Sequence, residues 1–218
     1  YVDEYRRANG GIIFPNPHEP TGGLRALYAI ELLLQENSDS VVVVDEAYID
    51  FADANASAVS LIDQYDNLLV VQTMSKSRAL AGLRIGYALG SAHLVEGLER
   101  IKNSFNYYPL GHVQLAAAVA SFNDRDYFEA TRKQVISSRE LLVDQLETLG
   151  FEVLPSAANF VFARHGAYLG ADLTRSLREQ NVIIRHFNKP RIDEFLRITV
   201  GTPEQNQQLI AALTELVG

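Results

Sequence analysis

Cysteine, an excess of basic residues and long apolar runs are all missing from this sequence of 218 residues. The lack of cysteine excludes disulfide bonds, thiolate metal sites and a cysteine nucleophile, and it fits the cytoplasmic location that we expect. The formal net charge of −8 argues against a nucleic-acid partner, because a phosphate backbone attracts a basic surface. No run approaches the ~18 apolar residues of a membrane span, and no signal peptide opens the sequence.

Metal and nucleotide-loop patterns are missing as well. The five histidines form no pair at ligand spacing and have no carboxylate or cysteine partner at such a spacing. We therefore expect no metal site. The glycine pairs at 10–11 and 22–23 are typical of turns and not of a phosphate-binding loop.

Apolar runs and amphipathic segments alternate in the first half of the sequence, which is typical of an α/β fold. In such sheets ligands bind at the carboxyl ends of the strands, where Asp45 and Lys76 fall. A helix is expected over about 24–35, with Thr21 as its N-cap. The predicted strands are Gly11–Pro15, Val41–Val44 and Leu68–Thr73, all parallel and buried, and a fourth over Ile85–Leu89.

The second half predicts a smaller α+β domain. A helix over about 124–149 ends at Gly150, a residue suited to terminate it, and Thr202 opens the last helix with a capping box. We expect residues 1–125 to be part of a large domain and residues 126–218 to be a small one. The other predicted elements are helices near 91–103, 112–122 and 171–180, and strands at 151–154, 159–163, 182–185 and 195–200.

The segment from Thr73 to Tyr87, with the sequence TMSKSRALAGLRIGY, carries the most specific chemical signal. Lys76 follows a hydroxyl residue directly after an apolar strand, and Arg84 comes eight residues later. A lysine amine can react with an aldehyde, and hydroxyls with a guanidinium suit a phosphate. An aldehyde and a phosphate on one ring are the two features of pyridoxal phosphate.

This segment resembles the cofactor-lysine motif of the fold-type I aminotransferases. Its residue pattern is most similar to that of the histidinol-phosphate aminotransferase family. The resemblance covers nearly the whole sequence and implies a pyridoxal-phosphate transferase type I fold, with a mostly parallel sheet and a smaller C-terminal α+β domain. Further matching elements, in the family's order, are NPHEPTG at 16–22, DEAY at 45–48, ANF at 158–160 and LRITVG at 196–201.

The resemblance also implies roles for the residues around the cofactor. Lys76 would hold pyridoxal phosphate and move the proton, Asp45 would pair with the pyridine nitrogen, and Tyr48 would bind the phenolic oxygen. Glu46 is interpreted as structural. Arg78 also lies near the phosphate contacts, and a solvated or dimer-facing role for it is the equal alternative. The phosphate would be bound by Thr73, Ser75 and Arg84.

On the substrate side, the resemblance assigns Arg197 to the substrate carboxylate, with an internal salt bridge as the alternative. Arg185 would pair with it to hold a phosphate, and Asn159 would help to orient Arg197. Glu19 stands where the family usually has asparagine, and we interpret it as outside the shared chemistry. Asn16 and His18 are possible local substitutes.

The implied function is transamination of L-histidinol phosphate with 2-oxoglutarate or glutamate by a cytoplasmic homodimer. An aromatic amino acid aminotransferase and a threonine-phosphate decarboxylase are enzymatic alternatives, because they share nearly all of these residues. A non-catalytic aminotransferase-like fragment or binding domain is the alternative from another class. Compared with the family, more than a hundred residues are expected to precede Tyr1, including a phosphate-binding glycine loop.

Overall fold

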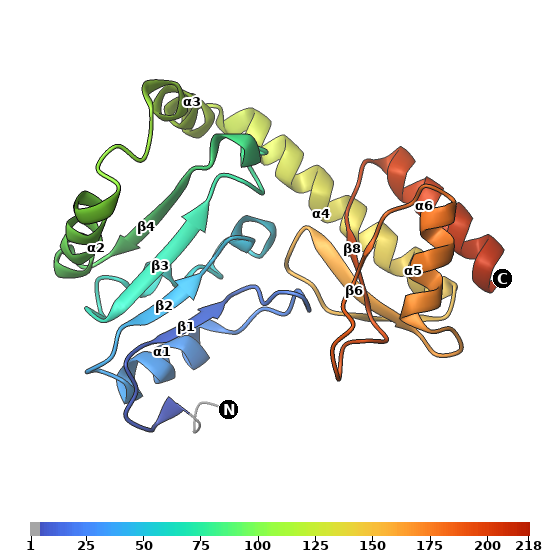
Figure 1. The fold of residues 1–218 in the computed structure, drawn as a ribbon, viewed down its shortest axis with the longest axis horizontal. Helices are drawn as coiled ribbons and strands as arrows, with labels where there is room; N and C mark the ends of the chain where they lie inside the picture. Colours follow the sequence, from blue (N-terminus) through green and yellow to red (C-terminus); the bar gives the residue numbers. More distant parts are fainter. Residues whose placement is uncertain (1–4) are drawn as a thin grey trace. The chain divides into compact units, whose positions relative to one another are not determined.

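A computed structural model describes residues 5–218 and divides them into two compact units (Figure 1). The first unit comprises the described residues up to Pro17 together with Leu24–Glu129, and the second comprises His18–Gly23 and Ala130–Gly218. The α/β class predicted from the sequence is confirmed. Among the described residues no helix is both long and apolar enough to cross a membrane.

The first unit contains a four-stranded sheet in the order β1 (Ile12–Pro15), β2 (Val42–Asp45), β3 (Leu68–Thr73) and β4 (Gly86–Gly90). The first three strands are parallel, as predicted, whereas β4 pairs antiparallel with β3. Residues 74–85 join these two strands with a single 3-10 turn at Ala81–Leu83 and no crossover α-helix, and the chain returns beside β3 in the opposite direction. The sheet therefore carries the Lys76 segment at one end of its β3–β4 pair.

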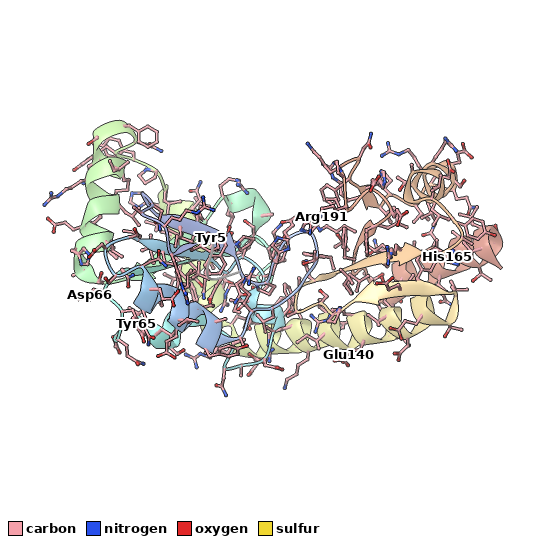
Figure 2. All side chains as sticks on the ribbon, turned by 90° about the horizontal axis from the view of Figure 1, so that it is seen from below. Tyr5, Tyr65, Asp66, Glu140, His165 and Arg191 are labelled. Carbon is pink, nitrogen blue, oxygen red and sulfur yellow. The ribbon has the colours of Figure 1, made fainter. Side chains whose placement is uncertain are left out.

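Helix α1 (Leu27–Glu36) covers the sheet of the first unit with Ile30, Leu33 and Leu34, which are buried against β1, β2 and β3. The hydroxyl of Tyr65 fastens the outer side of this helix, with hydrogen bonds of 2.8 Å to Glu31 and to Gln35 (Figure 2). One face of the sheet is thereby sealed by an apolar core.

The predicted start of α1 is wrong. The helix begins at Leu27 after Ala26, and no side chain caps it. Thr21 instead stabilises its own turn: its hydroxyl lies 2.8 Å from Nδ1 of His18 and accepts from the N–H of Gly23 at 3.3 Å. A hydroxyl that bonds within a local turn is not available to a helix further along.

The helices that complete the first unit leave much apolar surface uncovered. No residue of α2 (Ala92–Phe105) or α3 (His112–Asn123) is buried. Phe105 is 84% exposed, Tyr108 in the following loop 86% and Val113 74%. Single exposed apolar side chains are ordinary, but here they follow one another along two consecutive helices and the loop between them.

The second unit packs three helices on an antiparallel sheet. The strands are β5 (Phe151–Leu154), β6 (Phe160–His165), β8 (Leu196–Thr199) and β7 (Arg185–His186), in that spatial order. The core is formed from both layers, with Leu142, Leu146, Leu177, Leu213, Val161 and Ile198 among its buried residues.

The helices of this unit begin and end largely as the sequence predicts. Helix α4 (Arg125–Thr148) is followed by Gly150 in a left-handed conformation with φ of 85°, where a Cβ would lie 3.0 Å from Nε2 of His165. Helix α5 covers Gly170–Glu179. Helix α6 (Pro203–Val217) opens with the predicted capping box.

We expect Thr202→Ala to lower the free energy of unfolding by about 1 kcal/mol, because Thr202 accepts the N–H of Gln205 at the start of α6. Chemical denaturation measures the change. Thr148→Ala is the matched control, since its hydroxyl bonds only the carbonyl of Asp144 at an exposed helix end. Equal losses in the two variants would contradict a capping role.

Candidate functional site

Asp45 lies at the carboxyl end of β2, in register with Pro15 on one neighbouring strand and Val71 on the other. Its Oδ1 accepts the N–H of Ala47 at 3.0 Å, and its carbonyl accepts the N–H of Asn16 at 2.8 Å. The main chain thus fixes this half-buried carboxylate at the carboxyl ends of the parallel strands, which is where α/β sheets bind their ligands.

Glu46, the next residue, serves the interior of the unit. It is 1% exposed, and its carboxylate accepts from Ser57 Oγ at 2.7 Å, the Ala58 N–H at 2.6 Å and Gln72 Nε2 at 2.8 Å. Burial is the largest influence and raises the pKa of Glu46, against the opposing effect of these three donors. These contacts confirm the structural interpretation of Glu46.

Tyr48 and Lys76 come together although they follow different strands. Nζ of Lys76 lies 5.0 Å from the centre of the Tyr48 ring, within the range of a cation–π contact. Tyr48 is buried at 4% exposure and Lys76 is exposed. An amine, a phenol and the carboxylate of Asp45 are thus all placed by the ends of β2 and β3.

The turn after β3 gathers hydroxyl groups. Thr73 Oγ1 lies 2.9 Å from Ser75 Oγ and 3.2 Å from the carbonyl of Ile85, and it accepts the N–H of Ser75 at 3.1 Å. At the far end of the turn, Arg84 is exposed and donates from Nη1 to the carbonyl of Ala81 at 3.0 Å. The two hydroxyls therefore lie together, while the guanidinium of Arg84 contacts its own turn.

Two residues of this turn adopt left-handed conformations, Ala79 with φ of 53° and Arg84 with φ of 56°. A left-handed backbone costs a residue other than glycine about 1–2 kcal/mol. Residues with strained backbone conformations are most frequent at functional sites, where surrounding contacts hold the chain in place.

Ser77 and Arg78 supply such contacts, and the sequence predicted neither. Ser77 Oγ donates to the carboxylate of Asp50. Nη1 of Arg78 donates to the carbonyl of Ser121 at 2.7 Å, and its guanidinium lies 4.3 Å from the ring centre of Phe122. A second ring, that of Phe128, lies at 4.1 Å. A purely solvent-facing Arg78, one of the roles considered from the sequence, is therefore wrong.

In the second unit, Arg197 of β8 and Arg185 of β7 are direct cross-strand neighbours. The Arg197 guanidinium lies 4.3 Å from the ring centre of Phe160, and its side chain is only 16% exposed. Arg185 is exposed and lies 5.2 Å from the Phe187 ring. Like charges directly opposite each other on neighbouring strands repel one another. An anion bound between the two guanidinium groups would remove this repulsion.

Buried polar atoms near these arginines lack partners. Among the described residues, Nε of Arg197 and Oδ1 of Asn159 are buried without a hydrogen bond. Nη1 of Arg197 lies 3.4 Å from Oε1 of Glu19, so the internal salt bridge considered from the sequence is present. An unpartnered buried donor on a cation is a position for a ligand oxygen.

Asn16 directly follows β1. This side chain is fully buried, with Oδ1 accepting the N–H of Arg25 at 2.7 Å and Nδ2 donating to its carbonyl at 3.4 Å. Its contacts therefore hold the turn that follows β1.

The first unit thus carries an amine beside a phenol, with a carboxylate at the end of a neighbouring strand, and the second unit carries a pair of neighbouring arginines. The family model described as Aminotransferase class I and II matches residues 2–213. The chain therefore belongs to the class I and II aminotransferase family.

A histidinol-phosphate aminotransferase of Pseudomonas putida is 61% identical to the chain over 213 residues, which are 98% of this chain and 61% of that relative. The chain thus spans about three fifths of the length of this relative. Individual site residues are not assigned by this likeness, so the roles of Lys76, Asp45, Tyr48 and the arginines stay predictions.

Solved structures agree in fold. The histidinol-phosphate aminotransferase of Sinorhizobium meliloti in complex with pyridoxal-5'-phosphate is 26% identical with a TM-score of 0.85, and the match covers 95% of this chain and 57% of that one. The L-threonine-O-3-phosphate decarboxylase of Porphyromonas gingivalis is 27% identical with a TM-score of 0.76, covering 94% and 63%. The type I fold predicted from the sequence is confirmed.

The raised pKa of Glu46 gives a test of stability against pH. Its ordinary pKa is 4.5, and the folded state binds the proton more tightly than the unfolded chain. The contribution of Glu46 is therefore complete below the ordinary pKa and is lost as pH rises through the raised one. We expect the unfolding free energy of the unmodified protein, taken relative to that of Glu46→Gln, to fall as pH rises from about 4.5 through the raised pKa.

Urea denaturation at several pH values measures this difference. Glu99→Gln is the control, because it makes the same change at an exposed position of α2. A difference that grows with pH for Glu46→Gln would mean that the three hydrogen-bond donors outweigh burial.

Proposed function

We propose that the protein carrying this chain catalyses the pyridoxal-phosphate-dependent transamination of L-histidinol phosphate with 2-oxoglutarate, a step of histidine biosynthesis. The observation that carries the proposal is the 61% identity to a histidinol-phosphate aminotransferase along 98% of the chain. The arrangement of Lys76, Asp45 and Tyr48 supports it, because these residues gather at one edge of the sheet.

The donor set of the first unit fits the proposed cofactor. The amine of Lys76 suits its aldehyde, the carboxylate of Asp45 its pyridine nitrogen and the phenol of Tyr48 its phenolic oxygen. The hydroxyls of Thr73 and Ser75 suit its phosphate, with Arg84 supplying positive charge at the end of the same turn. When bound, the cofactor supplies an electron sink for the electron pair released at the substrate carbon.

Lys76 then has two tasks in the proposed reaction. Its Nζ would hold the cofactor, and the same Nζ, once free, would remove the proton from the substrate Cα. Ser77 and Arg78 on the C-terminal side of Lys76 are anchored to Asp50 and to the carbonyl of Ser121, so the main chain of the base is held still.

The arginine pair is the proposed substrate anchor. Arg197 and Arg185 would hold the phosphate of histidinol phosphate in one half-reaction and a carboxylate of glutamate in the other. The likeness to an L-threonine-O-3-phosphate decarboxylase keeps that activity as a second candidate, because the same pair suits its phosphate. An aromatic amino acid substrate would not need the second arginine.

We further propose a cytoplasmic homodimer, in which residues 1–125 are part of the large domain and residues 126–218 are the small domain. The apolar surface of α2 and α3 supports assembly, and the compact units that divide the described chain near Glu129 support the domain boundary. The absence of cysteine supports the compartment.

We expect Lys76→Ala to lower transamination by about 100- to 10,000-fold, because the general base and attachment point are lost together. Borohydride reduction of the protein with pyridoxal phosphate, followed by peptide mass mapping, should find the cofactor on the peptide of Lys76. Lys102→Ala, which changes an exposed lysine of α2, should retain both properties. Cofactor on another lysine would refute the assignment, and no cofactor on any lysine would favour the non-catalytic alternative.

A half-reaction screen tests the substrate. Histidinol phosphate, phenylalanine and threonine phosphate are offered in turn to the full-length protein with bound cofactor, and the absorbance change of the cofactor is followed. We expect histidinol phosphate to react fastest, and Arg197→Ala to reduce its kcat/KM by about 10- to 1000-fold, as loss of a charged hydrogen bond predicts. Rapid reaction of phenylalanine with no reaction of histidinol phosphate would refute the assignment.

A further inference from the structure

Arg197 meets an anion supplied by the chain itself. Oε1 of Glu19 lies 3.4 Å from Nη1 of Arg197, and the side chains are 42% and 16% exposed. Both residues belong to the second unit, because the segment His18–Gly23 is part of it. The contact is therefore internal to one compact body.

The loop that carries Glu19 is fixed at both ends of its turn. The N–H of Gly22 donates to the carbonyl of His18 at 2.7 Å, and the N–H of Ala157 donates to the carbonyl of Gly22 at 2.9 Å. Gly22 has φ of 78°, and a Cβ there would lie 2.3 Å from Oγ of Ser156. This close approach holds the loop against the segment between β5 and β6, so Glu19 is presented to Arg197 by a defined backbone.

The ion pair leaves part of the guanidinium unused. Glu19 reaches Nη1 at a long distance, whereas the buried Nε has no partner among the described residues. A carboxylate or phosphate that binds side-on forms two parallel hydrogen bonds with a guanidinium, which is the stronger arrangement. An incoming anion can thus gain a contact that Glu19 does not make.

We propose that Glu19 is the resting occupant of the Arg197 anion subsite, and that an anionic substrate binds by displacing its carboxylate. The proposal rests on the proposed function only in that Arg197 meets a substrate anion. In this role Glu19 lowers the affinity of the subsite for an anionic substrate. Its carboxylate neutralises the largely buried Arg197 between the two half-reactions, so a higher anion concentration is needed to fill the site. An ion pair at 3.4 Å whose carboxylate is 42% exposed is weak enough for such exchange.

Two variants that each remove one negative charge test this assignment in the full-length protein loaded with pyridoxal phosphate. Inorganic phosphate is titrated by calorimetry, and KM for histidinol phosphate is measured in parallel. We expect Glu19→Gln to bind phosphate about fivefold more tightly and to lower KM by a similar factor, because the half-exposed carboxylate that competes for Arg197 is lost. The amide keeps the size of the side chain and removes only its charge.

Glu194→Gln is the matched control. Glu194 pairs with Arg164 at 3.3 Å on the same sheet, so this variant makes the same change of net charge beside a different arginine. It should leave phosphate affinity unchanged. In an Arg197→Ala background, Glu19→Gln should no longer tighten binding, because the two residues act through one another.

Unchanged or weaker phosphate binding by Glu19→Gln would overturn the proposal and make the pair a structural one. A gain of the same size in Glu194→Gln, or a gain that survives Arg197→Ala, would overturn it too. If Glu19→Gln tightens phosphate binding while histidinol phosphate is not transaminated, the subsite assignment stands and the proposed function fails.

Discussion

The buried carboxylate of Glu46 is the contact on which the candidate site of the first unit depends. It joins the turn at Ala58 to Gln72 of β3, and so fixes where β2 ends. Successive residues of an extended strand point to opposite sides, so anchoring Glu46 inward directs Asp45 outward. Tyr48 follows on the same anchored segment. One unfavourable burial of charge thus defines the positions of two candidate cofactor ligands.

The turn that carries Lys76 shows how such positioning is maintained against strain. Left-handed Ala79 and Arg84 work against the stability of the turn, whereas the bond from Ser77 to Asp50 and the packing of Arg78 work for it. A shift of the lysine would break these contacts together. The turn is therefore held by its neighbours rather than by its own conformational preference.

The sequence could predict the features that local patterns determine. Apolar runs located the strands, and hydrophobic spacing with capping residues located most helices, because each signal lies within a few residues. The start of α1 was missed because Thr21 bonds locally to His18. The direction of β4 and the packing of Arg78 on aromatic rings depend on contacts between distant segments, which a local pattern does not encode.

The pairing of Glu19 with Arg197 shows most clearly where prediction from sequence ends. Glu19 was set aside because it departs from a family pattern, yet the fold brings it to the arginine expected to bind substrate. Burying Arg197 with one weak partner and an unpartnered Nε costs folding free energy that only a better anion can recover. Arg197 therefore limits the stability of the second unit and also supplies the free energy with which this unit would bind an anion. A side chain that departs from the pattern is best judged by the charge it faces in the folded chain.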